Sequence, residues 1–273
     1  MKKVHIGKKN WLYIPLIAMA IFYLLPMYVM LATGFKSFAE VDLKTMWNLP
    51  RGIHFDNYIE AYKHLSPYLK NSFLMVIPAT LISSMLGSLN GFILAKWKFR
   101  GADIIFPFIL FGMFIPYQSI IIPLVQFMSA VGIKGLAGLA MAHIIYGIPI
   151  TTLTFRNYYA SLPQELLEAA KIDGADMLGV YRHILLPISI PSFVVVLIWQ
   201  FTSAWNDFLF AVILTGNTEW PVTVALNNMA GSQIIQWNVQ MAGSFLAALP
   251  TLLVYIFLGR YFLRGLLAGS LKG

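Results

Sequence analysis

The stretch Glu168-Ala169-Ala170-Lys171-Ile172-Asp173-Gly174-Ala175 lies within the charged segment 162–191, in a half of the chain that is otherwise almost wholly apolar. With Glu165 and Asp176 on either side of it, the segment carries four carboxylates. Such a segment belongs in water, because burying an unpaired charge is costly. Its spacing predicts two short helices that meet at a bend at Gly174, since glycine commonly ends a helix.

Local signals predict where each short helix begins. Ser161 is the expected N-cap of the first helix, with Pro163 in the first turn and Gln164 completing a capping box. Asp173 is the expected N-cap of the second, with Asp176 at its third helical position. Small residues leave little bulk at the bend, which therefore fits a cleft in another protein. The plainest alternative is a solvated hairpin that only links two apolar segments.

The composition indicates an all-α membrane protein. Of the 273 residues, 59% are hydrophobic and 11% charged, which is more apolar surface than a soluble core needs. Each apolar run reaches the roughly 20 residues that cross a bilayer. The runs predict six transmembrane helices, at 11–33, 71–95, 104–128, 135–155, 184–214 and 239–259, with the charged loop between the fourth and the fifth.

The distribution of Lys and Arg predicts the orientation. With both termini on one side, thirteen basic residues fall on that side and six on the other, and the excess faces the cytoplasm. We therefore expect a cytoplasmic N-terminus (1–10), a transmembrane domain (11–263) and a cytoplasmic tail (264–273). Within the domain, 36–70 is external and the loop 156–187 is cytoplasmic. Because the basic residues are scattered between apolar runs, the net charge of +8 indicates membrane orientation and no nucleic-acid partner.

Two further features concern the first apolar run and the external segment. The run at 11–33 is too long for the core of a signal peptide and lacks a clear cleavage site, so we expect an uncleaved helix. In the external segment, Asn57 and Glu60 have the spacing of a capping box and predict a short interfacial helix.

Polar residues in the fifth apolar run form the candidate substrate path. Gln200, Ser203 and Asp207 are three and four residues apart and share a helix face, with Asn206 beside them. Trp205 supplies a ring that can stack on a sugar or anchor at the outer surface. An ionised Asp207 would cost about 2.5–3.5 kcal/mol at mid-membrane, so it needs compensation. Two interpretations remain open: a hydrated translocation surface, or an Asp207 that reaches outer water or has a structural partner.

Several motifs are absent from the sequence. It has no G-x-x-x-x-G-K-[ST] loop, so ATP would have to act through another subunit. The five histidines form no H-E-x-x-H motif, no Ser-His-Asp elbow is present, and the sequence contains no cysteine. We therefore expect no catalytic residues, no metal site and no cofactor in this chain. His143 is expected to pack with its polar atoms satisfied, and the spacing of Gly87 and Gly91 suits a packing notch.

The string E-A-A-x-x-D-G-A at 168–175, followed by Ile184-Leu185-Leu186-Pro187 and Pro191, resembles the cytoplasmic coupling loop of permease subunits of binding-protein-dependent ATP-binding-cassette importers. The resemblance extends to Ile115-Pro116 with Ile122-Pro123-Leu124, and to Trp205-Asn206-Asp207. The ending, with Gly269 and Lys272, is similar to that of carbohydrate permeases like the smaller maltose permease subunit, whose tail reaches the ATPase pair.

This resemblance implies a sugar importer in a bacterial or archaeal inner membrane. Residues that would contact the ATPase in the loop are Glu168, Ala169, Ala170, Asp173, Gly174 and Ala175. The implied partners are a second, homologous permease, two copies of a cytoplasmic ATPase that holds ATP and magnesium, and an external solute-binding protein, besides membrane lipid. The cargo would be a sugar or small glycoside. The competing function is an ion-coupled secondary transporter or channel that uses Asp207.

Overall fold

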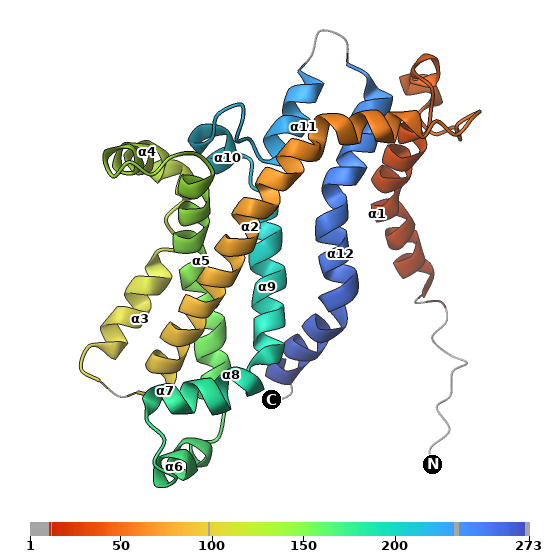
Figure 1. The fold of residues 1–273 in the computed structure, drawn as a ribbon. Coiled ribbons are helices and arrows are strands. Elements are labelled where there is room, and N and C mark those ends of the chain that lie inside the picture. Colours follow the sequence, from red (N-terminus) through yellow and green to blue (C-terminus); the bar gives the residue numbers. More distant parts are fainter. Residues whose placement is uncertain (1–10, 12, 98, 232–234, 271–273) are drawn as a thin grey trace. The chain divides into compact units, whose positions relative to one another are not determined.

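The computed structural model describes residues 11, 13–97, 99–231 and 235–270, and within these ranges the chain forms helices and no β-strand (Figure 1). The all-α class is therefore confirmed. The α-helices are α1 (Tyr13–Gly34), α2 (Asp56–Lys96), α3 (Ala102–Phe111), α4 (Ile121–Ala130), α5 (Gly135–Ala160), α6 (Glu165–Ile172), α7 (Met177–Val180), α8 (Leu186–Ile188), α9 (Ile190–Trp205), α10 (Leu209–Leu214), α11 (Val222–Ala230) and α12 (Trp237–Ser270). Shorter turns are η3 (Phe38–Glu40), η4 (Leu43–Thr45), η5 (Tyr117–Ile120) and the π-helical turn η6 (Tyr181–Leu185).

The chain divides into two compact units. The first comprises Met1–Ser66 and Leu226–Ala248, and the second comprises Pro67–Ala225 and Leu249–Gly273. Pro67, inside α2, is the first residue of the second unit.

In the first unit, Asn57 ties together the segments that precede and follow it. Its side-chain amide donates to the Gly34 carbonyl at 2.9 Å and to the Lys36 carbonyl at 2.8 Å, and its oxygen accepts from Asn238 at 2.8 Å. The predicted capping box with Glu60 is therefore wrong. The buried amide donates instead to the carbonyl of Gly34, the last residue of α1, and to that of Lys36 just beyond it.

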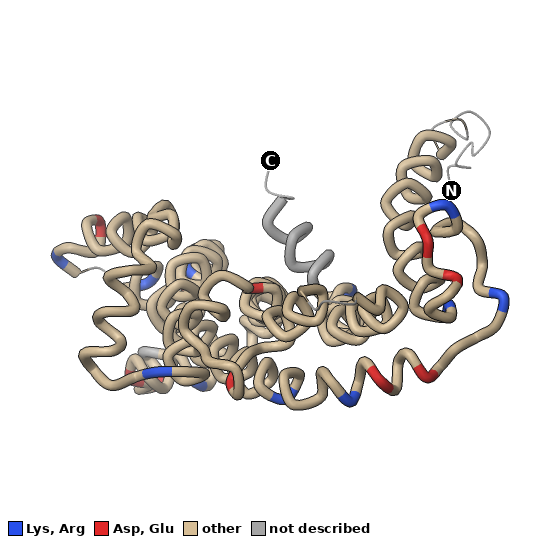
Figure 2. Tube along the Cα trace, turned by 90° about the horizontal axis from the view of Figure 1, so that it is seen from above, with Lys and Arg blue, Asp and Glu red and all other residues tan. Residues whose placement is uncertain are grey.

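The predicted external helix is the beginning of a longer one. α2 runs unbroken for 41 residues and includes both that helix and the apolar run at 71–95. Figure 2 shows charged residues along the first turns of α2 and in the segment before it, and few along most of the trace. The later part of the predicted external segment 36–70, with its charged residues, is therefore the beginning of α2.

Among the described residues, four helices are long and apolar enough to cross a membrane: Tyr13–Gly34, Asp56–Lys96, Gly135–Ala160 and Trp237–Tyr261. A bent pair, Met177–Ile188 and Ile190–Trp205, meets at 75° and makes a fifth candidate if counted as one span. The predicted run 104–128 is interrupted, because α3 ends at Phe111 and α4 begins only at Ile121. Pro116 lies in this break, where its missing N–H and its effect on the preceding residue disfavour helix. The run 184–214 is likewise divided, among the end of η6, α8, α9 and α10.

The second unit is organised around α5, which packs against α3, α9 and α10. α2 also approaches it closely, at the two glycines of the predicted notch. A Cβ on Gly87 would collide with Thr151, and one on Gly91 would lie 2.7 Å from the Arg156 backbone nitrogen. The packing role of these glycines is confirmed, since only a residue without a side chain permits this approach.

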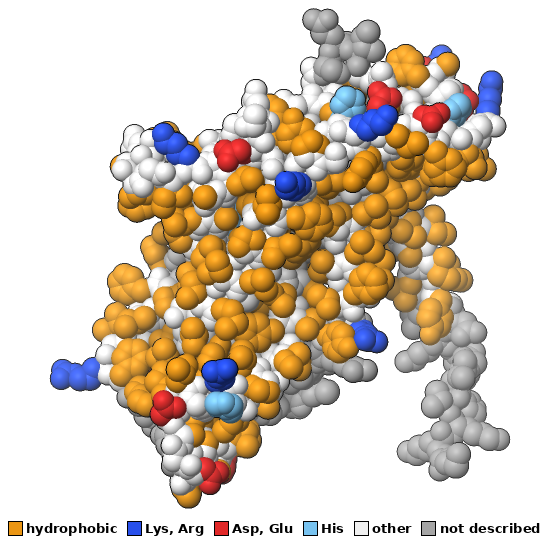
Figure 3. All heavy atoms as spheres, viewed as in Figure 1, with side chains coloured by type: hydrophobic (Ala, Val, Ile, Leu, Met, Phe, Trp, Pro, Cys, Tyr) orange, Lys and Arg blue, Asp and Glu red, His pale blue; other side chains and the backbone are white. Residues whose placement is uncertain are grey.

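Apolar side chains are numerous on the face of this unit that Figure 3 shows. Figure 3 shows them over the faces of α2 and α3, where Phe73, Ile77, Ile104 and Phe108 are exposed. Such a surface suits lipid or another apolar partner better than water. At one end of the unit lie α6, α7 and α8, and at the opposite end lie α4 and α10 (Figure 1). The two candidate sites occupy these two ends.

Candidate coupling loop and candidate substrate pocket

The bend between α6 and α7 is a Schellman motif. Gly174 has a positive φ of 81°, and beyond it the Ala175 N–H donates to the Ala170 carbonyl at 2.9 Å. The motif also places these two alanines in contact with the same apolar cluster. This turn explains the order of small residues in the stretch 168–175. It needs a glycine at the bend and small side chains at the two residues that its hydrogen bond joins. We name residues 165–180 the elbow.

Both predicted helix caps of the elbow are wrong. Ser161 ends α5: its N–H donates to Asn157 and Tyr158 carbonyls, and its hydroxyl donates to the Tyr158 carbonyl at 2.7 Å. The cap of α7 is Asp176, whose carboxylate accepts from the Gly179 N–H at 2.7 Å. α5 continues five residues beyond the predicted apolar run, to Ala160, so Ser161 lies at its end. The Schellman turn uses Gly174 and Ala175, which moves the start of the next helix to Asp176.

The elbow has an inner and an outer surface. Leu167 and Ala170 are each 5% exposed and pack into a cluster with Phe92 of α2 and Tyr159 of α5. On the other side, Ile172 is 86% exposed. Leu166, Leu178, Ala169 and the four carboxylates of Glu165, Glu168, Asp173 and Asp176 are also exposed. The elbow therefore exposes apolar and acidic side chains together, and the described residues of this chain leave them uncovered.

Four buried hydroxyl groups connect the elbow with the helices above it. Tyr181 donates to Ser88 at 3.0 Å, Ser88 lies 2.7 Å from the Tyr159 hydroxyl, and Tyr159 donates to Ser189 at 3.2 Å. Ser189 gives its own proton to the Leu186 carbonyl at 2.9 Å. Because each hydroxyl has one proton, Ser88 must be the donor to Tyr159. We name this directed series the hydroxyl chain.

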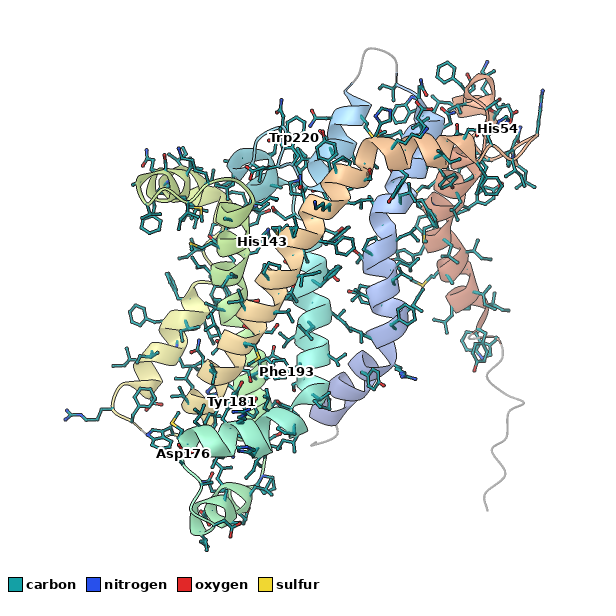
Figure 4. The ribbon with its side chains drawn as sticks, in the orientation of Figure 1. His54, His143, Asp176, Tyr181, Phe193 and Trp220 are labelled. Carbon is teal, nitrogen blue, oxygen red and sulfur yellow. The ribbon has the colours of Figure 1, made fainter. Side chains whose placement is uncertain are left out.

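The hydroxyl chain crosses three elements at a distortion of the backbone. Ser88 belongs to α2 and Tyr159 to α5, whereas Tyr181 opens the π-helical turn η6, and Ser189 stands at the 75° corner before α9. The Tyr181 ring also stacks on Phe92, with centroids 5.7 Å apart. Figure 4 shows Asp176, Tyr181 and Phe193 at this end of the unit. Packing and hydrogen bonds therefore join the elbow to α2, α5 and α9.

The predicted ATPase contacts in the tail lie at the end of the chain. α12 continues past the predicted end at 259 and includes Gly269. Lys272 and the N-terminal segment 1–10 lie outside the described residues.

The second candidate site is a pocket of about 480 Å³ at the opposite end of the unit. Aromatic rings form one wall: Phe210 lies 5.0 Å from Tyr117 and 5.3 Å from Tyr146, between ring centroids. The other lining groups include His143 and the polar side chains of Ser203, Asn206 and Asp207. We name it the His143 pocket; Figure 4 shows His143 on α5, away from the elbow.

Asp207 has structural partners. Its two carboxylate oxygens accept from the backbone N–H groups of Phe210, at 3.4 Å, and Ala211, at 3.0 Å, in the first turn of α10. His143 Nε2 lies 3.4 Å from Asp207 Oδ2, and both side chains are more than nine-tenths buried. Asp207 thus has structural partners, as the second of the two interpretations expected. It also lines a pocket, as the first expected. The predicted satisfied role of His143 is wrong, because its Nε2 is buried without a hydrogen bond of good geometry.

The other predicted path residues divide between pocket and core. Ser203 and Asn206 are exposed at the pocket, whereas Gln200 lies behind it and donates to the His143 carbonyl at 2.9 Å. Trp205 is 2% exposed and stacks on Phe201, with centroids 5.5 Å apart. This burial favours a packing role for Trp205, and its contact with a sugar remains a prediction.

Sequence reasoning missed the aromatic wall of the pocket. Tyr146 follows His143 by one helical turn, a spacing that places both on one face of α5. That spacing was available in the sequence. Tyr117 and Phe210 follow breaks in predicted apolar runs, so their approach to α5 required the tertiary structure.

Residues 87–267 match the family model described as "Binding-protein-dependent transport system inner membrane component". Among curated proteins, a probable ABC transporter permease protein of Pyrococcus horikoshii is 47% identical over 96% of each chain. The xylose/arabinose import permease protein of Haloferax volcanii is 36% identical, covering 91% of this chain and 90% of the relative. The glucose import system permease protein of Saccharolobus solfataricus is 32% identical, covering 96% and 95%.

Solved structures show the same fold. A chain of a bacterial ABC transporter involved in the import of the acidic polysaccharide alginate superposes with a TM-score of 0.78 at 20% identity, covering 96% of this chain and 100% of that one. A MetNI methionine ABC transporter in an inward-facing conformation gives a TM-score of 0.56 at 16% identity, covering 76% and 98%.

Proposed function

This chain belongs to the family of binding-protein-dependent transport system inner membrane components, and we propose from that membership that it moves a sugar or small glycoside. It is a multi-pass membrane protein and a permease subunit of an ATP-driven importer. Support for the cargo comes from two relatives named as importers of xylose/arabinose and glucose. The aromatic wall and polar groups of the His143 pocket are also typical of small-molecule sites.

The elbow is the proposed contact with the ATPase. Ile172, Leu166 and Leu178 are exposed apolar side chains on the same short segment as four exposed acidic residues, and protein interfaces combine apolar and polar groups in this way. The residues predicted to contact the ATPase then divide by role. Glu168, Ala169 and Asp173 face the partner, whereas Ala170 and Ala175 close the turn at Gly174 that presents them.

Movement of the elbow would be passed on through its inner surface. Leu167, Ala170 and the hydroxyl chain join it to α2, α5 and α9, so these elements would move as one body when the ATPases close. Such rigid-body motion is a common form of switching, because packed interfaces have discrete arrangements. The chain itself would carry out no chemistry, and ATP with magnesium would be held by the ATPase.

The proposed assembly contains this chain, a second homologous permease that supplies the other half of the path, two ATPase copies and an external solute-binding protein. A related alginate transporter has been solved with its pentasaccharide-bound periplasmic protein, which supports this kind of partner. We propose six spans, with the broken segments at α3–α4 and α9–α10 each counted as one, both termini cytoplasmic, and the inner membrane of a bacterium or archaeon as the location. Gly269 and Lys272 would make a second contact with the ATPase.

The proposed function rests on the elbow, which packs one set of side chains against the helices and exposes another set to a partner. Reconstitution of the importer tests it. ATP-dependent sugar uptake is expected only when the permease pair, the ATPase and the solute-binding protein are present together. Vesicles that hold this chain alone should not accumulate sugar. The alternative, an ion-coupled transporter that uses Asp207, predicts the opposite: uptake by the chain alone, abolished by collapsing the ion gradient and indifferent to ATP.

A further inference from the structure

We infer that the His143 pocket is a binding site for a neutral sugar, in which His143 and Asp207 together hold one hydroxyl group and the aromatic wall holds the face of the ring. The inference rests on the proposed sugar import. It adds that this chain, and not the partner permease alone, contacts the cargo.

The first support is the unsatisfied nitrogen of His143. The residue is 6% exposed, its Nε2 is buried, and no hydrogen bond of good geometry reaches that atom, although Asp207 Oδ2 lies 3.4 Å away. A buried polar atom left unpaired costs roughly 1–3 kcal/mol, so a ligand group that pairs with this nitrogen gains that free energy. A sugar hydroxyl placed here can accept from the imidazole N–H and donate to the Asp207 carboxylate.

The second support is that the histidine is held in position by surrounding groups. Gln200 donates to its backbone carbonyl at 2.9 Å, and a Cβ on Gly147 would collide with the Gln200 amide, so only glycine leaves room for that contact. Phe210 meets the imidazole edge-on, with centroids 6.0 Å apart. A preorganised donor gives affinity at lower cost than a mobile one.

The third support is the aromatic wall. Tyr117, Tyr146 and Phe210 lie with their ring centroids 5.0–6.3 Å apart from one another. Rings provide an apolar face for the C–H side of a pyranose or furanose, and the half-buried tyrosines can add hydroxyl groups at the edge. The volume of about 480 Å³ falls within the roughly 300–1,000 Å³ of small-molecule sites.

The charge of the pocket selects the class of sugar. Among the described residues that line the pocket, Asp207 is the acidic one, and none is Lys or Arg. A uronate or phosphorylated sugar would meet a like charge without a compensating cation, which disfavours binding. We therefore expect neutral sugars to bind and acidic sugars to be excluded.

The test uses the complete importer in lipid nanodiscs, without the solute-binding protein and with a non-hydrolysable ATP analogue. Binding of radiolabelled glucose, xylose, arabinose and maltose is measured, with glucuronate as the acidic comparison. His143→Leu and Tyr117→Leu should each weaken binding of the accepted neutral sugar by about tenfold, the effect of one lost buried contact. His64→Leu and Tyr255→Leu carry the same substitutions at exposed positions and should bind as the wild type does.

A third variant covers the case in which the two core substitutions impair assembly. Ser203 is exposed on α9 at the pocket, so Ser203→Trp fills the pocket without disturbing buried packing and should abolish binding. Wild-type binding in all three variants would place the sugar site elsewhere and overturn the inference, while ATP-dependent uptake by the wild type would still stand. Glucuronate binding equal to that of the neutral sugars would overturn the proposed class. Absence of ATP-dependent uptake of every sugar would instead overturn the proposed function.

Discussion

The Tyr159 hydroxyl donates to Ser189 Oγ at 3.2 Å and thereby joins the last turn of α5 to the corner that precedes α9. The same hydroxyl accepts from Ser88, so a single atom holds two of the links in the hydroxyl chain. Tyr159 is fully buried, and each of its links is shielded from water. If the elbow moves α9, this atom lies at the centre of the connection.

Tyr159→Phe should therefore reduce coupling. The substitution keeps the ring and its stack on Phe155, but it leaves the Ser88 proton without an acceptor, at a cost of about 1–3 kcal/mol. We expect ATPase binding to persist while more ATP is hydrolysed per sugar imported, measured in vesicles as the ratio of the two rates. Tyr255→Phe, at an exposed position of α12, is the matched control. An unchanged ratio in Tyr159→Phe would exclude a coupling role for the hydroxyl chain.

Gly174→Ala should weaken ATPase binding. With φ at 81° and no atom within 4 Å of the added Cβ, its cost is conformational and about 1–2 kcal/mol. Gly132→Ala offers the matched control, since Gly132 has φ of 74° and equally open space but lies before α5. Co-purification of the ATPase with a tagged permease should fall in the first variant only. Equal losses in both would show that general destabilisation, and not the elbow, accounts for the effect.

Asp176→Ala should impair the elbow more than Asp173→Ala. Asp176 caps α7 through the Gly179 N–H, and losing a cap costs about 1 kcal/mol. Asp173 makes no such bond to α7, so its removal should change only the charge presented to the ATPase. The affinity of the ATPase for each variant, measured at low and high salt, distinguishes the two effects. A stronger, salt-independent loss in Asp173→Ala would contradict this assignment.

Ala170→Leu and Ala169→Leu should separate folding from docking. Ala170 is buried against the cluster, and overpacking there typically costs about 1–3 kcal/mol, so we expect a lower unfolding temperature in detergent. Ala169 is exposed, and its substitution should leave that temperature unchanged while altering ATPase co-purification. The opposite pattern would mean that the inner and outer surfaces of the elbow have been assigned the wrong way round.

Local chemistry was sufficient to predict several features. The apolar runs predicted helices, and all but one of the four long apolar helices match a run closely. A run of about twenty apolar residues is typical of a helix that crosses a membrane. The bend at Gly174 and the notch at Gly87 and Gly91 were also predictable, since positive φ and close helix approach both require glycine. The family match agrees with the resemblance that the stretch around Glu168 suggested.

Other features depended on contacts between distant segments. Ser161 had the residue type of an N-cap, but only the extension of α5 made it a C-terminal residue. Asn57 had the residue type and spacing of a local cap, but in the structure its partners are the Gly34 carbonyl of α1, the Lys36 carbonyl and the Asn238 amide of α12. Whether a polar side chain bonds to a local or a distant partner depends on which groups are buried beside it. A short stretch of sequence does not show that burial.

By itself, then, the sequence determined the helical class, the membrane environment and the position of the elbow, because hydrophobic length and glycine geometry act locally. Only the tertiary structure decided that His143 lies beside Asp207, 64 residues later, and that Tyr181 reaches Ser88. Those pairs arise because helices packed side by side bring buried polar groups together, and such groups must find partners across the packing surface.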